Sequence, residues 1–310
     1  ETPLDDTFRD GRLAYSLNWD KPINRNNRRN LGFSFSHEYD FTSLAGNARW
    51  QHDINQKNTS LSAGVNLELD SIDAVGGIPD GLTDTASRLR LGDSDDRQVL
   101  DLIFGVTQII DRSSLFQVNY SYSNADGYLT DPYKLLSVVD SVTAEPNYYV
   151  YEERPDSRTK QSLFGKYKKM LANQDIVTAS YRFMTDDWGI DSHTVDLTYR
   201  WKMDDGYFIQ PHLRWYQQSA ADFYNYFLVD GDPLPQYASA DYRLGEMTAT
   251  TLGVKFGKAI DDKHLWSLRL ETYNQSGDSS PPEAFGQLTN QDLYPDVDAV
   301  IVQFNYSFKF

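Results

Sequence analysis

The end of the chain carries the pattern that most restricts its fold. Every even-numbered residue from 300 to 310 is apolar or aromatic, and the odd-numbered residues from 303 onward are polar. A period of two over this length predicts a β-strand with one apolar face. A strand of a soluble β-sandwich also alternates, but it rarely runs this long and then stops at the chain end on Phe310.

The same alternation recurs along the whole chain, and no comparable helical period accompanies it. Twelve further segments carry an alternating apolar face: 13–19, 31–39, 44–50, 61–69, 100–106, 116–122, 163–167, 177–183, 195–201, 209–215, 250–256 and 266–270. With the last segment they make thirteen candidate strands. The terminal pattern resembles the signal by which bacterial outer-membrane barrels are recognised for assembly.

The connections between these segments alternate between short and long. Short ones fall at 53–58, 110–113, 172–175, 204–206 and 258–264, and long ones at 71–97, 124–157, 218–245 and 276–298. The brief links at 40–42 and 186–192 are predicted at the same end of the strands as the long connections. Short periplasmic turns and long outer loops are typical of outer-membrane barrels. We therefore expect an all-β fold, a transmembrane antiparallel β-barrel of the bacterial outer membrane.

Hydropathy and aromatic placement agree with this expectation. The mean hydropathy is only -0.59, which suits strands that face lipid with every second residue. Aromatic residues also favour the two membrane–water boundaries. The outward aromatic residues at the turn ends of the strands are Trp19, Trp50, Trp201, Tyr207, Trp266 and Phe310, and Trp215 lies outward at the opposite end. These residues are predicted to form two membrane girdles.

The strand count carries a parity problem. If the last strand descends to the periplasm, thirteen strands make the first one descend as well, which would leave Glu1 outside the cell. Single-chain bacterial barrels have an even number of strands, so we expect 14 or 16 in the complete barrel. Either residues 1–8 hide a weak strand or an N-terminal portion is missing. Residues 1–310 are otherwise expected to form one barrel domain.

Charge is distributed unevenly along the chain. The five predicted outer loops, 71–97, 124–157, 186–192, 218–245 and 276–298, contain 25 Asp and Glu but only 6 Lys and Arg, in a chain whose net charge is -16. An acidic outer face argues against nucleic acid as a partner. One interpretation is that Ca²⁺ or Mg²⁺ bridges these carboxylates within the loops or to lipopolysaccharide. The other is that the carboxylates are simply solvated. The densest cluster, Asp93, Asp95 and Asp96, is a weak divalent-ion candidate, and no other metal or cofactor is expected.

The residues in inward phase are polar and mildly basic. Residues predicted to line the lumen are Arg182, Asp196, Arg200, Lys202, His212, Arg214, Lys255, Arg269 and Glu271. Such a lumen would favour small anions or zwitterions once they pass the acidic mouth. The alternative is that internal salt bridges fill the lumen and close it. Lumen width depends on strand number and tilt, which the sequence does not set.

Signals for catalysis are weak. The chain has no Cys, no G-x-S-x-G motif and no His and Asp pairing at zinc-ligand spacing. We therefore expect no enzymatic activity. A hydrolase site assembled across strands, from a His such as His212 and a Ser on the rim, stays a third hypothesis.

Three polar-aromatic stretches are predicted at the outer ends of strands: EERPDSRT at 152–159, DDWGIDSHT at 186–194 and SAADFY at 219–224. Together with residues 28–43, they resemble an uncharacterised bacterial outer-membrane β-barrel family, catalogued only as a domain of unknown function. The resemblance covers nearly the whole chain and implies a longer N-terminus, with 16 strands if three are missing. It implies fold and location but no activity.

These stretches supply candidate residues at the barrel mouth. Glu152, Glu153, Arg154, Asp156 and Arg158 are predicted to form a buried charge network there. Trp188 and Phe223, with Asp186, Asp187 and Asp222 beside them, are predicted to anchor loops folded into the lumen. One interpretation is that these residues pin the loops, and the other is that they contact a ligand or a partner.

The sequence leaves two main functional hypotheses. The first is a porin-like channel that passes small polar or anionic solutes. The second is an anchor or conduit barrel that holds a redox or adhesive protein in the lumen or at the surface. Expected partners are membrane lipid, lipopolysaccharide and the barrel-assembly machinery.

Overall fold

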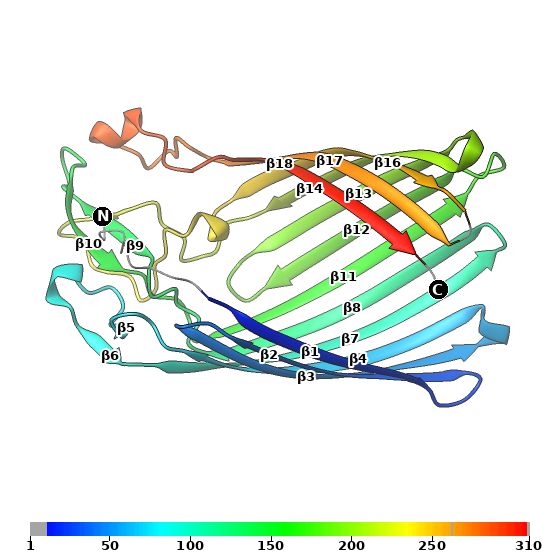
Figure 1. Ribbon diagram of the computed structural model, residues 1–310. Helices are drawn as coiled ribbons and strands as arrows, with labels where there is room; N and C mark the ends of the chain where they lie inside the picture. The colour runs from blue at the N-terminus through cyan, green and yellow to red at the C-terminus, as the bar shows by residue number, and fades with distance from the viewer. Residues whose placement is uncertain (1–10, 262, 309–310) are drawn as a thin grey trace.

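Thirteen strands form one antiparallel sheet that curls into a barrel wall in the computed structural model (Figure 1), which describes residues 11–261 and 263–308. Each strand pairs with its neighbours along the chain, apart from short strands that lie in the loops. In order of pairing, the wall strands are β1 (Leu13–Pro22), β2 (Asn27–His37), β3 (Phe41–Ile54), β4 (Thr59–Ile72), β7 (Asp95–Asp111), β8 (Ser114–Gly127), β11 (Ser157–Met170), β12 (Ile176–Asp186), β13 (Asp191–Lys202), β14 (Tyr207–Gln218), β16 (Met247–Ala259), β17 (His264–Gly277) and β18 (Val297–Phe308). The predicted barrel fold and the thirteen readable strands are confirmed.

The long connections, which the sequence predicted as irregular loops, contain short strands and single helical turns. The strands are β5 (Ile78–Pro79), β6 (Arg90–Gly92), β9 (Leu135–Val139), β10 (Pro146–Tyr151) and β15 (Leu228–Val229). The turns are the 3-10 helices η1 (Asn55–Lys57), η2 (Thr85–Ser87), η3 (Asp204–Gly206), η4 (Tyr242–Leu244) and η5 (Gly286–Asn290). β10 and β15 flank β9, and β5 pairs with β6. No helix in the described part of the chain is long and apolar enough to cross a membrane.

The wall is built so that its apolar side chains face outward. Strand register sets this arrangement, because residues paired across two strands point to the same face. Leu252 of β16 pairs with Leu213 of β14 and is 55% exposed. Many other apolar residues in outward phase are also exposed. The inward phase holds polar residues such as Asn66, which donates to the Asp101 carboxylate at 3.1 Å. A broad exposed apolar band is what a lipid-facing surface requires.

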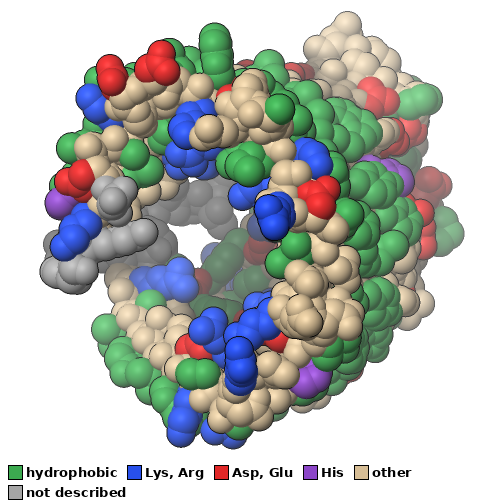
Figure 2. Space-filling view, turned by 90° about the vertical axis from the view of Figure 1, so that its right-hand side faces the viewer, with side chains coloured by type: hydrophobic (Ala, Val, Ile, Leu, Met, Phe, Trp, Pro, Cys, Tyr) green, Lys and Arg blue, Asp and Glu red, His purple; other side chains and the backbone are tan. Residues whose placement is uncertain are grey.

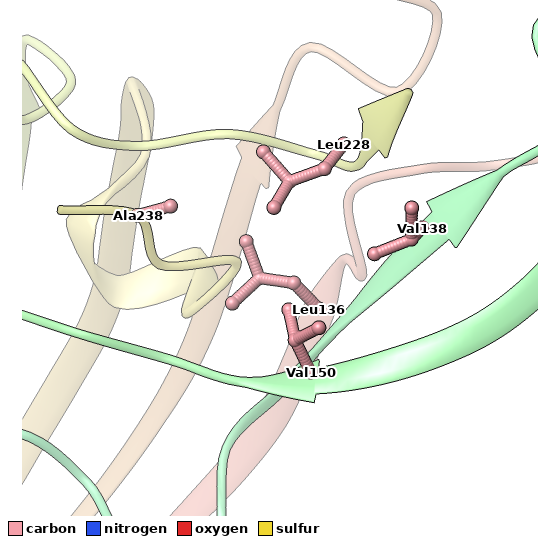
Figure 3. Close-up of a cluster of buried hydrophobic side chains, with 5 residues drawn as sticks. All are labelled: Leu136, Val138, Val150, Leu228 and Ala238. Carbon is pink, nitrogen blue, oxygen red and sulfur yellow. The ribbon is translucent and has the colours of Figure 1, made fainter. Parts of the chain in front are cut away.

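The buried core lies outside the wall, in the loops. We use the term cap for residues 73–94, 128–156, 187–190, 219–246 and 278–296, which project from one end of the barrel (Figure 1). One buried cluster joins strands β9, β10 and β15 through Leu136, Val150 and Leu228, as Figure 3 shows. Two more clusters surround Trp188 and Leu288. The cap is therefore a folded unit with a core of its own.

The two edge strands of the sheet, β1 and β18, are not paired with each other in the described residues. Figure 1 shows them on either side of an open seam, and both are exposed along almost their whole length. The possible weak strand at 1–8 and the girdle residue Phe310 lie outside the described residues.

Candidate functional site

The barrel encloses a hollow whose lining differs from one side to the other. Figure 2 looks along the barrel from the end with the short turns and shows Lys and Arg side chains gathered around the opening. Nine inward positions on β11 to β17 form what we call the basic wall: Lys160, Lys166, Lys168, Arg182, Arg200, Lys202, Arg214, Lys255 and Arg269. The inward acids on the same strands below the mouth are Asp196 and Glu271.

The opposite side of the lumen, on β1 to β8, carries more acids than bases. Its inward charged residues are Asp20, Arg28, Arg49, Asp53, Glu68, Asp70, Asp95, Arg97 and Asp101. Some of these residues pair with one another. Arg28 lies 3.3 Å from Asp20, and Arg97 lies 2.6 Å from the buried Asp70 carboxylate. The lumen therefore carries its excess positive charge on one side.

Most cations of the basic wall have no acidic partner. Among the described residues, Arg269 alone of the nine forms an ion pair with a carboxylate, a long one at 3.8 Å from Glu271. Arg182 and Arg200 lie instead over the rings of Phe164 and Phe208, at 5.6 and 3.6 Å from the ring centres. Such contacts position a guanidinium without neutralising its charge. Charged contacts in inward phase on these strands in the described residues join Arg158 with Asp186, His212 with Asp196 and Glu271, and Arg269 with Glu271.

A polar recess of about 300 Å³ lies in the basic wall. Its lining residues are Asp196, Thr198, Gln210, His212, Arg214, Lys255, Arg269 and Glu271. Six of the nine predicted lumen-lining residues therefore meet at one place, and Arg182, Arg200 and Lys202 lie elsewhere along the same strands. Since strand pairing brings together residues that are distant in sequence, the sequence alone did not predict the recess.

His212 is held between two carboxylates in this recess. Its Nδ1 lies 2.8 Å from Oε1 of Glu271, and its Nε2 lies 3.0 Å from Oδ2 of Asp196. Gly253 separates His212 from Glu271 in the sheet, and a Cβ at this position would meet the Cγ of Glu271 at 2.4 Å. The glycine therefore opens the path across β16 that this contact needs.

The five histidines give no support to a hydrolase site. A nucleophilic Ser needs a His within hydrogen-bond reach. In the described residues, the side-chain partners of the histidine rings are Thr42 for His37, Asn27 for His52, Tyr181 for His193, Asp196 and Glu271 for His212, and Asp261 for His264. No hydroxyl of a Ser is among these partners.

At the mouth, the EERPDSR stretch forms a buried ion network with a second loop. Arg154 lies 2.6 Å from Glu152 and donates at 2.9 Å to Asp241, and both carboxylates are 1% exposed or less. Ser239 donates to Glu152, and Arg243 pairs with Asp241 and with Asp131. Burial raises the pKa of Glu152, although Arg154 opposes it. Despite burial, hydrogen bonds from Arg243 and its charge lower the pKa of Asp241.

Glu153, Asp156 and Arg158 were predicted to belong to this network and do not: Arg158 pairs with Asp186 instead, and Glu153 and Asp156 have no partner in the network. Neither forms an ion pair with a cation in the described residues. Glu153 packs against Gly81, where a Cβ would lie 1.5 Å from its Oε2. Burial, together with the negative charges of Asp156, Asp80 and Glu152, raises the pKa of Glu153 to about 7. The backbone of Glu153 pairs with that of Ala238, and its carboxylate lies near other acids rather than near Arg154.

The second predicted group pins the loops to one another. Arg158 pairs with Asp186 at 2.5 Å and lies over the Trp188 ring at 4.3 Å. Asp186 also accepts from the backbone N–H groups of Trp188 and Ile190. Trp188 packs edge-on against Phe223 at 5.0 Å, so two motifs far apart in sequence meet. These contacts favour the loop-pinning interpretation.

Asp187 and Asp222 complete this arrangement. The Asp187 carboxylate accepts from the backbone N–H of Thr159 at 2.9 Å, and the backbone N–H of Asp222 donates to the Trp188 carbonyl at 2.8 Å. Gly189 has a φ of +85°, and a Cβ there would lie 2.3 Å from the Asp222 carboxylate. The motif therefore needs glycine at this turn.

Sequence reasoning missed Asp131, Ser239, Asp241 and Arg243 because they come from loops with no alternation to follow. A local signal existed for Asp241, which accepts from the N–H of Arg243 in the manner of a helix cap at the start of η4. No group of three or more His, Asp or Glu in the described residues could hold a metal ion. The structure thus adds no support for a divalent site at Asp93, Asp95 and Asp96.

The predicted girdle residues other than Phe310, which lies outside the described residues, are at the strand ends in outward phase. Trp19, Trp50 and Trp201 are 46%, 44% and 53% exposed near the short turns. Tyr207 stacks on Phe256, and Phe256 meets Trp266 edge-on, also at that end. Trp215 lies at the cap end of β14.

Comparison with known proteins identifies the fold. The profile of a family described as "Protein of unknown function (DUF3570)" matches residues 1–308. No curated protein matches the sequence.

The ferric enterobactin receptor PfeA of Pseudomonas aeruginosa, in a mutant form, is similar in structure, with a TM-score of 0.54 and 12% identity, over 87% of this chain and 43% of that receptor. The siderophore receptor PirA of Acinetobacter baumannii gives 0.52 and 11%, over 97% and 49%.

A third receptor gives the same result. BauA, the ferric preacinetobactin receptor of Acinetobacter baumannii, has a TM-score of 0.50 and 13% identity, over 97% of this chain and 51% of the receptor. The chain thus spans about half the length of the solved structures that it matches. At such low identity the similarity shows the fold alone, which is that of an outer-membrane β-barrel.

Proposed function

We propose that this chain, which belongs to the family of proteins of unknown function DUF3570, forms a channel through the bacterial outer membrane for small polar or anionic solutes. The observation that carries the proposal is the basic wall of the lumen. Its cations face a hollow and, apart from Arg269, have no acidic partner in the described residues. Unpaired positive charge along an aqueous path lowers the energy of an anion that crosses it.

The negative charge of the cap should repel entering anions only weakly. Its carboxylates lie outside the barrel wall, and charges farther apart than about 8 Å are largely screened at physiological ionic strength. Several are also neutralised where they lie, as Asp241 is by Arg154 and Arg243. We therefore expect the basic wall to set ion preference and the cap to govern access.

Single-channel recording in planar lipid bilayers tests the proposal. Purified protein should give stepwise conductance, and the reversal potential in a salt gradient should indicate a preference for anions. Removing two inward cations, as Lys166→Gln with Arg182→Gln, should reduce that preference. The matched change Lys57→Gln, in a turn outside the lumen, should leave it unaltered. A protein that inserts fully but never conducts would contradict the channel.

A second candidate function is supported by the surface of the cap. Val75, Leu89, Leu91 and Val142 are 62%, 52%, 69% and 78% exposed, although the cap is predicted to lie in water. Exposed apolar residues of this kind are typical of a protein contact when they are contiguous. This candidate, an anchor or conduit barrel, predicts a subunit that co-purifies at fixed ratio and is lost in Leu91→Glu. Purification of the protein alone, with no loss in the variant, would reject it.

The open seam supports a proposal about the complete domain. Within residues 11–261 and 263–308, the outer edges of β1 and β18 have no strand beside them, and hydrocarbon does not tolerate unpaired backbone groups. We propose that further strands close the barrel between them, for an even total of 14 or 16 in one domain. A cysteine pair, Ser16→Cys with Asn305→Cys, should not form a disulfide in the assembled protein. Efficient disulfide formation would mean that the two edges pair directly.

The barrel fold also supports a proposal about the molecules that contact this protein. We propose that lipid and lipopolysaccharide contact the exposed apolar band and that the barrel-assembly machinery inserts the chain. Binding of Ca²⁺ or Mg²⁺ by the outer carboxylates stays a prediction. Chelation with EDTA, followed by limited proteolysis of the cap, measures it.

A further inference from the structure

Three cations of the basic wall lie in one row across neighbouring strands. Lys255 of β16 pairs in register with Gln210 of β14 on one side and with Arg269 of β17 on the other. The pairing of Trp201 with Ile209 places Arg200 of β13 beside Gln210 in the same row. Neighbouring strands are about 4.8 Å apart, so the row spans about 14 Å of the lumen wall, a distance that long Arg and Lys side chains can narrow by turning toward one another.

Nothing in the described residues balances the charge at the centre of this row. The positive charges of Arg269 and Arg200 both act on Lys255. Neither Lys255 nor Arg200 forms an ion pair with a carboxylate in the part of the chain that the structure describes. Arg200 lies 3.6 Å from the centre of the Phe208 ring, which holds the guanidinium in place. Like charges gathered in this way repel one another unless an anion lies between them.

The nearby carboxylates are turned toward His212. Glu271 and Asp196 lie 2.8 and 3.0 Å from the two ring nitrogens. Ionised carboxylates only accept hydrogen bonds, so the ring satisfies both of them only when both of its nitrogens carry hydrogen. In that doubly protonated form, His212 offsets part of the negative charge of the two acids. Glu271 also lies 3.8 Å from Arg269 at one end of the row, but in the described residues neither acid forms an ion pair with Lys255 or Arg200.

We propose that Arg200, Gln210, Lys255 and Arg269 form a binding site for a phosphate group on the lumen wall. The proposal rests on the proposed channel function and names the solute class. Two guanidinium groups offer forked N–H donors that match the geometry of phosphate oxygens, and the Lys255 ammonium adds a point charge. The Gln210 amide adds a neutral donor. A phosphate dianion also balances most of the charge of three cations.

Isothermal titration calorimetry of the detergent-solubilised protein with inorganic phosphate tests the site directly. The wild type should bind phosphate saturably at low ionic strength, and Lys255→Gln and Arg269→Gln should each weaken binding about ten-fold. Lys255→Arg, which keeps the charge, should retain most of it. Arg49→Gln removes one inward cation from the opposite side and should leave binding unchanged. Absence of saturable binding in the wild type, or equal losses in the control, would overturn the proposal.

Further ligands identify the source of the phosphate group. Tighter binding of glycerol phosphate than of inorganic phosphate would assign the site to a phosphorylated solute, and the reverse order would assign it to free phosphate. Succinate, a dicarboxylate of similar charge, should bind more weakly than either. Tighter binding of succinate would contradict a phosphate site.

Conductance separates this inference from the channel proposal. If the protein conducts chloride, phosphate should reduce the chloride current in the wild type and much less in Lys255→Gln. Calorimetric binding without any conductance would reject the channel and keep the site. Conductance without calorimetric binding or block by phosphate would reject the site and keep the channel. Because each result bears on one proposal, the two can fail independently.

Discussion

The barrel wall and the cap are held together by different interactions. In the wall, backbone hydrogen bonds join each strand to the next, and apolar side chains face outward, where Leu252 is 55% exposed. In the cap, apolar side chains are buried, and ion pairs such as Arg154 with Asp241 have almost no access to water. The wall therefore depends on a lipid environment, whereas the cap depends on specific side-chain contacts. Single substitutions should damage one and spare the other.

The largest expected effect is on the cap. Arg154→Ala would leave the carboxylates of Glu152 and Asp241 buried without this partner, and breaking a buried ion pair costs about 3–5 kcal/mol. Limited proteolysis should cut the loops of the variant much faster while the wall stays resistant. Arg88→Ala, which removes an exposed cation from the same cap, serves as the control. Equal cleavage of both variants would mean that the buried network does not hold the cap.

The converse change should damage the wall and spare the cap. Leu163 lies near the middle of β11 and is 53% exposed on the outer face. Leu163→Arg should destabilise the folded barrel by about 2–4 kcal/mol, since it places a charge in hydrocarbon. Ser162→Arg, one residue away on the inner face, should cost much less. Urea unfolding in lipid vesicles measures both, and equal losses would contradict the assigned faces.

A smaller effect is expected at the recess. Gly253→Ala would place a Cβ 2.4 Å from the Cγ of Glu271, so the contact between Glu271 and His212 should break. Overpacking of this kind costs about 1–3 kcal/mol. Gly165→Ala on β11, where a Cβ meets nothing within 4 Å, provides the matched control. Urea unfolding of the two variants compares them, and similar stabilities would show that Glu271 moves aside without cost.

The smallest expected effect concerns pH. The pKa of Glu153 is raised to about 7, by burial first and then by Asp156, Asp80 and Glu152, above its usual value of 4.5. The folded cap therefore holds this proton more tightly than the unfolded chain does. The resulting stabilisation is complete below about pH 4.5 and is lost as the pH rises through about 7. Cap proteolysis should accelerate between pH 5 and pH 8, and Glu153→Gln should flatten this dependence. An unchanged profile in the variant would exclude Glu153 as the cause.

The sequence predicted the wall better than the cap because neighbouring residues reveal the face of a strand but not the distant partners of a loop residue. Alternation is a property of neighbouring residues, so faces such as 195–201 and 250–256 could be assigned from the chain alone. The distant partner of Arg154 could not, since Asp241 lies 87 residues away in another loop. For the same reason the short strands β9, β10 and β15 were predicted as irregular loop.

By itself, the sequence determined the barrel class and the inward and outward phase of each strand, because a period of two sets the face of every residue. Only the tertiary structure decided which inward residues meet. Strand register places Lys255 between Gln210 and Arg269, and Gly253 between His212 and Glu271, although the sequence separates each pair by at least 14 residues. Register depends on the pairing of whole strands, so the recess and the proposed phosphate site could not be predicted from any one segment.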